Sequence, residues 1–473
     1  MPVHRVIDLF PDASLPLGLI EEVCAGAGPA RCRRRLLPAA AVLIFVLGCA
    51  LFYGEGYGEV ARKLAGWLAP LAGPGGWHLP GTGALARARR RLGPLPVEAL
   101  FGRLAGGLAG PGTPGAYGFG RLLVSLDGTM LDVPFTPANV AAFGPPPGGG
   151  GRGGWPQVRL VTLAACGSRG IVAAVFGGRA AAASSEQDLA RAIAATGRLH
   201  RGMLVIADRN FCGHPVVAAL AGTGAGVLVR ATSHQRFPVV QALADGSYLS
   251  VLADPAAARR RHNRNAMRAA RGSALPREPA TLPGIPIRVA EADITITPAG
   301  GAPRTERCRL ITTILDHRQA PATAIATCYA QRWESETGYR EIKVFTRGPG
   351  RVLRSKDPAG IAQEIWALLC AAQITHTARA AAAAAGGLDP DRISYTITLR
   401  AIRRALTTTA TTATSIASEA LARLLPPRRH RSYPRHKNTS TARRRDTRAG
   451  LTGTINYKIT ISPATQASDL PGP

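Results

Sequence analysis

Two aspartates, each directly after a short apolar stretch, are candidates for chemistry. Asp127 follows the run 121–126 and precedes Gly and Thr, which predicts a strand that stops at a carboxylate where the chain turns. Asp208 follows the run 203–207 at the carboxyl end of a predicted parallel strand, where open α/β sheets place their ligands. A purely structural interpretation stays open for each. Asp127 could be an ordinary strand-end residue, and Asp132 on the next apolar stretch competes with it. Asp208 could be a helix cap.

A third acid stands out within a predicted helix over residues 321–346. One face of this helix carries four side chains: Tyr329, Arg332, Glu336 and Lys343. At 100° per residue they span a sector of about 60°, whereas Glu334 and Glu341 fall on the other side. Geometry therefore selects Glu336 among three glutamates. The alternative is a solvated charged face held by i,i+4 pairs.

Three acids from different elements are suited to metal-dependent phosphodiester chemistry. Two divalent ions need several carboxylate ligands, one of them shared between the ions. We expect Asp127 and Asp208 to hold one ion, and Asp127 with Glu336 to hold the second. Such chemistry needs no Ser or Cys nucleophile.

The four-residue helix face also has a recognisable spacing. Tyr329-x2-Arg332-x3-Glu336-x6-Lys343 resembles the Y-R-E-K signature of the insertion-sequence-four family of bacterial DDE transposases. The segments around Asp127 and Asp208 are similar to the family's first and second aspartate regions. Similar stretches extend the resemblance over nearly the whole chain, at 36–59, 88–93, 136–143, 207–211 and 457–461.

The resemblance implies a DNA transposase that cleaves the ends of its insertion sequence and joins the 3′ ends to target DNA. It implies Asp127, Asp208 and Glu336 as catalytic metal ligands for two Mg²⁺ ions, with Mn²⁺ able to substitute. The implied partners are double-stranded DNA, both terminal inverted repeats and target, and a second copy of the chain in the synaptic complex. The implied location is the bacterial cytoplasm, at the nucleoid. DNA contacts are implied for three residues: Tyr329, Arg332 and Lys343.

Two departures from the family pattern are visible. Phe135 stands where relatives tend to have an acid in a V-P-D-T-P segment, which affects a loop outside the three acids. Family members that form a DNA hairpin stack a flipped base on a tryptophan of an inserted β-domain, and the insertion here contains no Trp. Tyr248 or Phe237 could substitute, so the resemblance does not imply a hairpin step.

The elements that must position the three acids follow an α/β order. Short apolar strands are predicted at 121–127, 158–165, 170–176, 203–208 and 226–231. A helix at 186–197, opened by Ser184-Ser185, lies between the third and fourth. This order predicts a ribonuclease-H-like mixed sheet with flanking helices over residues 119–395, although other α/β folds share it. We expect a partly β insertion at 232–305, with strand-like pieces at 286–290 and 293–297, then a strand at 308–315 and a helix at 358–385.

Helical patterns precede this core, and a basic tail follows it. Residues 1–118 predict a helical DNA-binding domain with helices at 18–27, 36–52, 57–71 and 82–104. Gly83 to Leu92 could be a basic recognition helix or a solvated face. Arginine-rich residues 396–473 form a candidate contact with DNA phosphates.

Composition narrows the classes of partner. The 473 residues carry a net charge of +29, which favours a polyanionic partner. Eight scattered cysteines without zinc-ligand spacing indicate a reduced, cytosolic protein. The uncharged run 36–54 is broken by Pro38 and Gly48, which favours a buried helix over a membrane span. Two rival classes stay open: a DNA-binding protein of the same fold without cleavage, and a membrane or scaffold protein built on that run.

Overall fold

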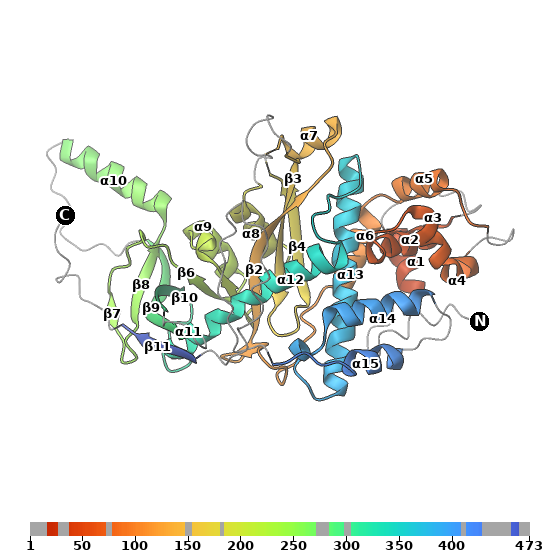
Figure 1. Ribbon diagram of the computed structural model, residues 1–473. Coiled ribbons are helices and arrows are strands. Elements are labelled where there is room, and N and C mark those ends of the chain that lie inside the picture. The colour runs from red at the N-terminus through yellow and green to blue at the C-terminus, as the bar shows by residue number, and fades with distance from the viewer. Residues whose placement is uncertain are drawn as a thin grey trace. The chain divides into compact units, whose positions relative to one another are not determined.

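The computed structural model divides the chain into two compact units (Figure 1). The first contains Met1–Tyr117, Leu122–Arg198 and Trp333–Pro426, and the second contains Gly118–Arg121, Leu199–Arg332 and Pro427–Pro473. The structure describes residues 17–26, 37–71, 78–146, 154–179, 184–270, 283–297, 304–407, 413–427 and 456–462. Most of the basic tail, arginines 428–448 included, lies outside the described residues.

Three antiparallel strands form the sheet of the first unit. β2 (Arg121–Asp132) pairs with β3 (Gln157–Ala165), and β3 pairs with β4 (Ile171–Gly178). The predicted helix after β4 is α8 (Glu186–Ala195), which packs on β3 and β4. It begins with a capping box in which Ser185 and Asp188 satisfy each other's backbone N–H, as the Ser-Ser start predicts.

A long helix, α13 (Pro358–Ala385), lies at the centre of the first unit. Asp357 caps it by accepting from the N–H of Gly360, and Pro358 stands at its first position, where proline is tolerated. Because α13 is apolar almost all round, it is buried by several helices. These are α2 (Ala39–Leu51), α6 (Leu95–Leu104), α14 (Tyr395–Thr407) and α15 (Ala413–Leu421).

The N-terminal helices share this core. They also include α1 (Leu17–Gly26), α3 (Tyr57–Lys63), α4 (Ala65–Leu68), a 3₁₀ turn at Ala69–Leu71 and α5 (Thr82–Leu92). The expected helix 82–104 is broken into α5 and α6 because Gly93 adopts φ +69° and Pro94 follows it. The apolar run is helix α2, buried as predicted. Within the described ranges, no helix is long and apolar enough to cross a membrane.

The second unit holds a mixed sheet. β5 (Met203–Ala207) and β6 (Gly226–Arg230) are parallel and joined by α9 (His214–Gly222). β10 (Arg304–Thr312) pairs antiparallel with β6 and with β9 (Gly284–Thr297). The other edge of β9 pairs with β8 (Tyr248–Ala253) and with β11 (Asn456–Ile461), while β7 (Gln241–Ala242) pairs with β8. The prediction of a mixed α/β fold with flanking helices is confirmed.

Two predicted elements differ in detail. The insertion contains a basic helix, α10 (Pro255–Ala270), beside its strands, and the sequence pattern did not reveal it. The predicted helix 321–346 is one helical run of changing type. Its parts are α11 (Ala322–Tyr329), a 3₁₀ turn at Ala330–Arg332, α12 (Trp333–Arg340) and a π-helix at Glu341–Thr346. A uniform 100° per residue therefore does not hold along its length.

Candidate active site

Asp127 lies within β2, and the prediction that it ends the strand is wrong. Its partner across the ladder is Thr162, and β2 continues through Gly128 as far as Asp132. Gly128 does not mark a turn, because it pairs with Val161 inside β2, and a Cβ there would overlap the carboxylate of Glu186. Its N–H donates to Asp127 Oδ1 at 2.9 Å. Glycine thus allows an acid of α8 to lie beside the strand next to Asp127.

Three side chains, spaced four residues apart, join the α12 and π-helix segment to β2. Ser335 Oγ donates to Ser125 Oγ at 2.6 Å. The Tyr339 hydroxyl donates to the backbone oxygen of Asp127. Lys343 Nζ donates to the backbone oxygen of Met130 at 2.9 Å and to Thr129 Oγ1 at 3.1 Å. The helix that carries Glu336 is therefore fixed along the strand that carries Asp127.

Tyr339 is the buried centre of this contact. Besides donating to Asp127, its hydroxyl accepts from Thr162 N at 3.1 Å and from Thr162 Oγ1 at 2.9 Å. Burial, reinforced by the negative charges of Asp127 and Glu186, raises the pKa of the Tyr339 hydroxyl. The hydroxyl stays protonated and can keep donating to the strand.

The opposite side of the same segment holds a buried ion cluster. Glu334 and Glu341 pair with Arg169 of the β3–β4 turn at 2.8 and 3.0 Å, and Asp391 pairs with it as well. Both glutamates are therefore structural, in agreement with the predicted separation from Glu336. Glu336 itself is half-buried.

Lys343 already has protein partners. Two hydrogen bonds to β2 use two of its three ammonium donors. Burial, with the nearby charge of Arg347, lowers the pKa of Lys343, and Asp132 partly offsets this. The third donor has no acceptor among the described residues.

The second unit carries the other three predicted residues. Asp208 directly follows β5, as predicted, and also caps the 3₁₀ turn Arg209–Phe211 by accepting from Asn210 N at 2.8 Å. Burial raises the pKa of the Tyr329 hydroxyl. The positive charge of Arg332 opposes this shift, and the negative charge of Asp208 adds to it. The charges of Arg332 and Asp208 thus both act on the Tyr329 hydroxyl.

The donor chemistry of the three acids suits a hard divalent cation. Carboxylate oxygens without sulfur or imidazole are the ligands that Mg²⁺ and Mn²⁺ prefer. Asp127 and Glu336 belong to the first unit and Asp208 to the second. Within the part of the chain that the structure describes, no three His, Cys, Asp or Glu side chains form a group that could hold a metal ion.

The departures from the family pattern can be located. Phe135 is 61% exposed, just before the short helix α7 (Pro137–Phe143). Tyr248, one candidate base-stacking residue, is only 6% exposed, and its hydroxyl donates to Glu291 at 3.3 Å. Phe237 is half-buried. Tyr248 is therefore poorly placed to stack an external base.

Sequence reasoning missed three residues that shape the site: Glu186, Arg169 and Tyr339. Glu186 lies in the first turn of the predicted helix 186–197, where acids are common for reasons of helix stability alone. Arg169 lies between Ser168 and Gly170 in the β3–β4 turn and has φ +62°, so no periodic pattern marks it. Tyr339 had a usable signal, because it lies four residues before Lys343 and so shares its face.

Comparisons with known proteins match both units of the chain. A family model described as "Transposase DDE domain" matches residues 118–374, and one described as "Insertion element 4 transposase N-terminal" matches residues 10–102. The chain is 27% identical over 429 residues to "Transposase InsG for insertion sequence element IS4" of Escherichia coli (strain K12), covering 88% of this chain and 89% of the relative. A solved structure, the piggyBac transposase synaptic complex with hairpin DNA, matches at 9% identity with a TM-score of 0.40, covering 88% of this chain and 80% of that chain.

Proposed function

Because the chain belongs to the DDE transposases of the insertion-element-4 type, we propose that it cleaves the ends of its own insertion sequence and joins the 3′ ends to target DNA. The family consists of metal-dependent enzymes that cut DNA and transfer the cut strand, with a ribonuclease-H-like core. This chain would act on DNA of the nucleoid in the bacterial cytoplasm.

We assign Asp127, Asp208 and Glu336 as the catalytic acids. The observation that carries the assignment is the hydrogen bond from Tyr339 to the backbone oxygen of Asp127. It joins the strand of the first acid to the helix of the third, while Glu334 and Glu341 are bound to Arg169. Of the two glutamates of α12, Glu336 is the one that the Y-R-E-K spacing selects, and Glu334 is bound to Arg169.

The acids would hold two Mg²⁺ ions, Asp127 and Asp208 the first and Asp127 with Glu336 the second. Bound there, the ions would activate water or a DNA 3′-hydroxyl as nucleophile and stabilise the leaving 3′-oxygen. The all-carboxylate donor set supports this choice and would also accept Mn²⁺.

DNA contacts are proposed for the remaining signature residues. Arg332 offers a guanidinium fork for a phosphate, and Lys343 offers the ammonium donor left over from its bonds to β2. Tyr329 would pack against the same strand. The partners would be terminal inverted repeats and target DNA, with two copies of the chain holding two ends together.

The test is cleavage of the DNA that flanks the gene, with purified protein and Mg²⁺. Glu336→Gln and Asp127→Asn should each reduce cleavage by at least about 1,000-fold, because electrostatic stabilisation of the transition state is lost. Asp132→Asn is the matched control, an acid on the same strand whose carboxylate accepts from Gln157 at 2.9 Å. It should retain cleavage.

Each contrary result has a defined meaning. Equal cleavage by wild type and Glu336→Gln would remove Glu336 from the mechanism. Loss of cleavage in Asp132→Asn with retention in Asp127→Asn would move the first acid to Asp132. Binding without cleavage by the wild type would favour a DNA-binding protein that has lost the reaction.

A further inference from the structure

A cationic cavity of about 460 Å³ lies in the first unit, among the α2–α3 loop, the end of the π-helix and α14. Five basic residues line it: Lys63, Arg347, Arg351, Arg403 and Arg404. Glu55 is its single acidic lining residue, and it pairs with Lys63 at 2.5 Å. The cavity therefore has an excess of positive charge and room for a small anionic group.

Arg347 is the unusual member of this set. It is 5% exposed, yet its Nε and Nη1 have no hydrogen-bond acceptor, and it has no ion pair among the described residues. Burial lowers the pKa of its guanidinium. A buried cation with unused donors is costly unless something satisfies it. A ligand anion or a water molecule in the cavity could satisfy these donors.

Its neighbours bring further donors to the cavity. Arg351 is exposed at the rim and lies over Gly348 and Gly54, where a Cβ on Gly348 would come within 2.6 Å of Arg351 Nε. Gly348 has φ +101°, which only glycine adopts readily. Arg403 donates through Nε to the backbone oxygen of Leu51 at 2.6 Å. Among the described residues, no carboxylate pairs with its charge.

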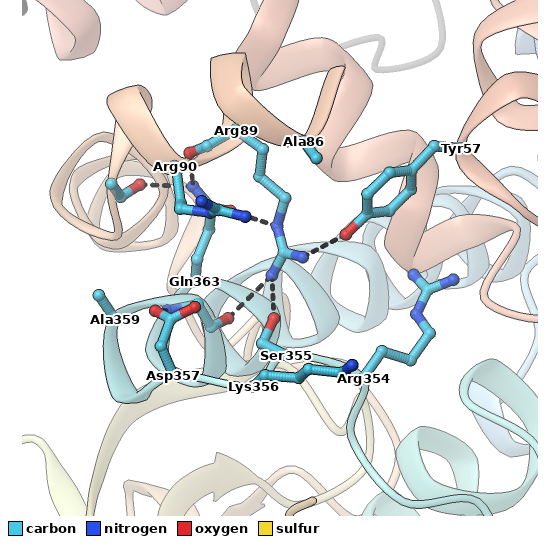
Figure 2. Close-up of a pocket in the computed structure, with 12 residues that line it drawn as sticks. Tyr57, Ala86, Arg89, Arg90, Arg354, Ser355, Lys356, Asp357, Ala359 and Gln363 are labelled. Carbon is cyan, nitrogen blue, oxygen red and sulfur yellow. Dashed lines mark hydrogen bonds between the residues drawn. The ribbon is translucent and has the colours of Figure 1, made fainter. Parts of the chain in front are cut away.

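A neighbouring cavity of about 220 Å³ offers a contrast (Figure 2). Its buried arginine, Arg89, donates to Gln363 and Ser355 at 2.5 Å and to the Tyr57 hydroxyl, and it pairs with Glu364 at 3.3 Å. The protein itself satisfies that guanidinium. Of the two cavities, the one around Arg347 is the one whose buried arginine has donors left for a ligand.

We propose that the Arg347 cavity binds a backbone phosphate of the DNA substrate, in addition to the contacts of the Y-R-E-K residues. The guanidinium forks of Arg347 and Arg351 match phosphate oxygens, and Arg403 adds charge. Arg347 follows Lys343 by one helical turn, so the cavity would extend the row of phosphate contacts beyond the signature. This proposal rests on the proposed function.

The test measures binding of a fluorescently labelled duplex of the element's end to full-length protein, by anisotropy in EDTA over a range of NaCl concentrations. Arg347→Gln and Arg351→Gln should each weaken binding about tenfold and reduce the slope of log K against log salt by about 0.9, because one phosphate contact is lost. A scrambled duplex should lose affinity equally, since phosphates carry no sequence information. Arg423→Gln, an exposed arginine of the same unit outside the cavity, should keep the slope.

A second measurement, with inorganic phosphate as the probe, distinguishes a cavity that binds a free anion from one that binds a DNA phosphate. If phosphate raises the melting temperature of the wild type, and Arg347→Gln loses this rise while its DNA slope stays unchanged, the cavity holds a free anion and the DNA assignment is wrong. An unchanged slope in both variants without a phosphate effect also overturns the proposal. If Arg347→Gln fails to fold, Arg351→Gln at the rim decides.

Failure of the cavity and failure of the proposed function give different results. Unchanged slopes together with Mg²⁺-dependent cleavage by the wild type would overturn the cavity alone. Absence of cleavage by the wild type would overturn the proposed function, and the slopes in EDTA would still decide the cavity.

Discussion

Arg169 and Arg347 are both buried in the first unit, but their surroundings are opposite. Three acids surround Arg169, and burial, which would lower the pKa of its guanidinium, is outweighed by Glu334, Glu341 and Asp391, so that pKa is raised. No acid forms an ion pair with Arg347 within the described residues, and burial lowers its pKa although Tyr53 and Asp132 partly offset this. Arg169 therefore stabilises the fold through its ion pairs, whereas Arg347 has the surroundings of a ligand-binding residue.

The comparison teaches how to separate the two kinds of buried charge. A structural charge has its partners within the fold, so removing it leaves those partners unsatisfied. A binding charge lacks partners in the free protein, so removing it relieves a cost. The two arginines should therefore respond to the same substitution with opposite signs.

The largest effect is expected from Arg169→Met. It would remove the cation that Glu334, Glu341 and Asp391 share, of which Glu341 also pairs with Arg379 at 3.5 Å, and destabilise the fold by about 3–5 kcal/mol. Urea unfolding followed by circular dichroism measures the change. Arg169→Lys keeps the charge but loses the planar guanidinium fork, so its free energy of unfolding should lie between those of Arg169→Met and the wild type. A loss below about 1 kcal/mol would make the cluster no stronger than a surface pair.

The next effect is expected on the other face of α12, from Tyr339→Phe. Removing the hydroxyl would cost about 1–3 kcal/mol, because Thr162 loses its acceptor and Asp127 O loses its donor. Cleavage per folded molecule should fall about tenfold or more as the helix of Glu336 loosens from β2. Tyr395→Phe, another buried hydroxyl of the same unit, bonded to Thr346, is the control. Equal cleavage losses in both would remove Tyr339 from positioning.

A smaller effect of opposite sign is expected from Arg347→Met. Stability should stay unchanged or rise by about 1 kcal/mol, because a desolvated cation with unused donors is replaced by an apolar side chain. The measurement is the same urea titration used for Arg169→Met. Destabilisation comparable to Arg169→Met would show that the two arginines do not differ in kind.

The smallest effect concerns the proton of Lys343. Its pKa is lowered in the folded state, so the unfolded state binds the proton more tightly, and stability rises as pH increases through the folded pKa toward 10.5. Arg347→Met removes one lowering charge, so the pKa of Lys343 should rise and the stability gain at alkaline pH should shrink. The pH dependence of Lys343 acetylation, read by mass spectrometry, measures this. An unchanged profile would mean that Arg347 does not act on Lys343.

The regular elements were predictable from local pattern. α13 has the predicted bounds of 358–385, and β5 ends just before Asp208, because long apolar helices and short apolar strands are set by neighbouring residues. The insertion helix α10 was missed, because its arginines and alanines have no apolar period. The local apolar pattern thus predicts the helices and strands that pack in the core, and it does not predict an exposed basic helix.

The contacts of the site were less predictable. Gly128 after Asp127 reads as a turn in sequence, but in the fold it makes room for Glu186 from a distant helix. The separation of Glu336 from Glu334 was predictable from helix geometry over two residues, where the change of helix type has no effect. The unsatisfied donors of Arg347 follow only from tertiary packing, so no spacing could reveal them.

The π-helix after α12 has a consequence for how this region could evolve. Its backbone bonds reach five residues back, as from Arg347 N to Ile342 O at 3.0 Å, so the turn carries one residue more than an α-helix would. Deleting one residue between Lys343 and Arg347 would restore α-helical winding and leave the facing of the following residues nearly unchanged, because the π-turn already accommodates one extra residue. Loss of a single residue should therefore be tolerated in this turn more readily than in a regular α-helix, where it would rotate everything downstream by about 100°.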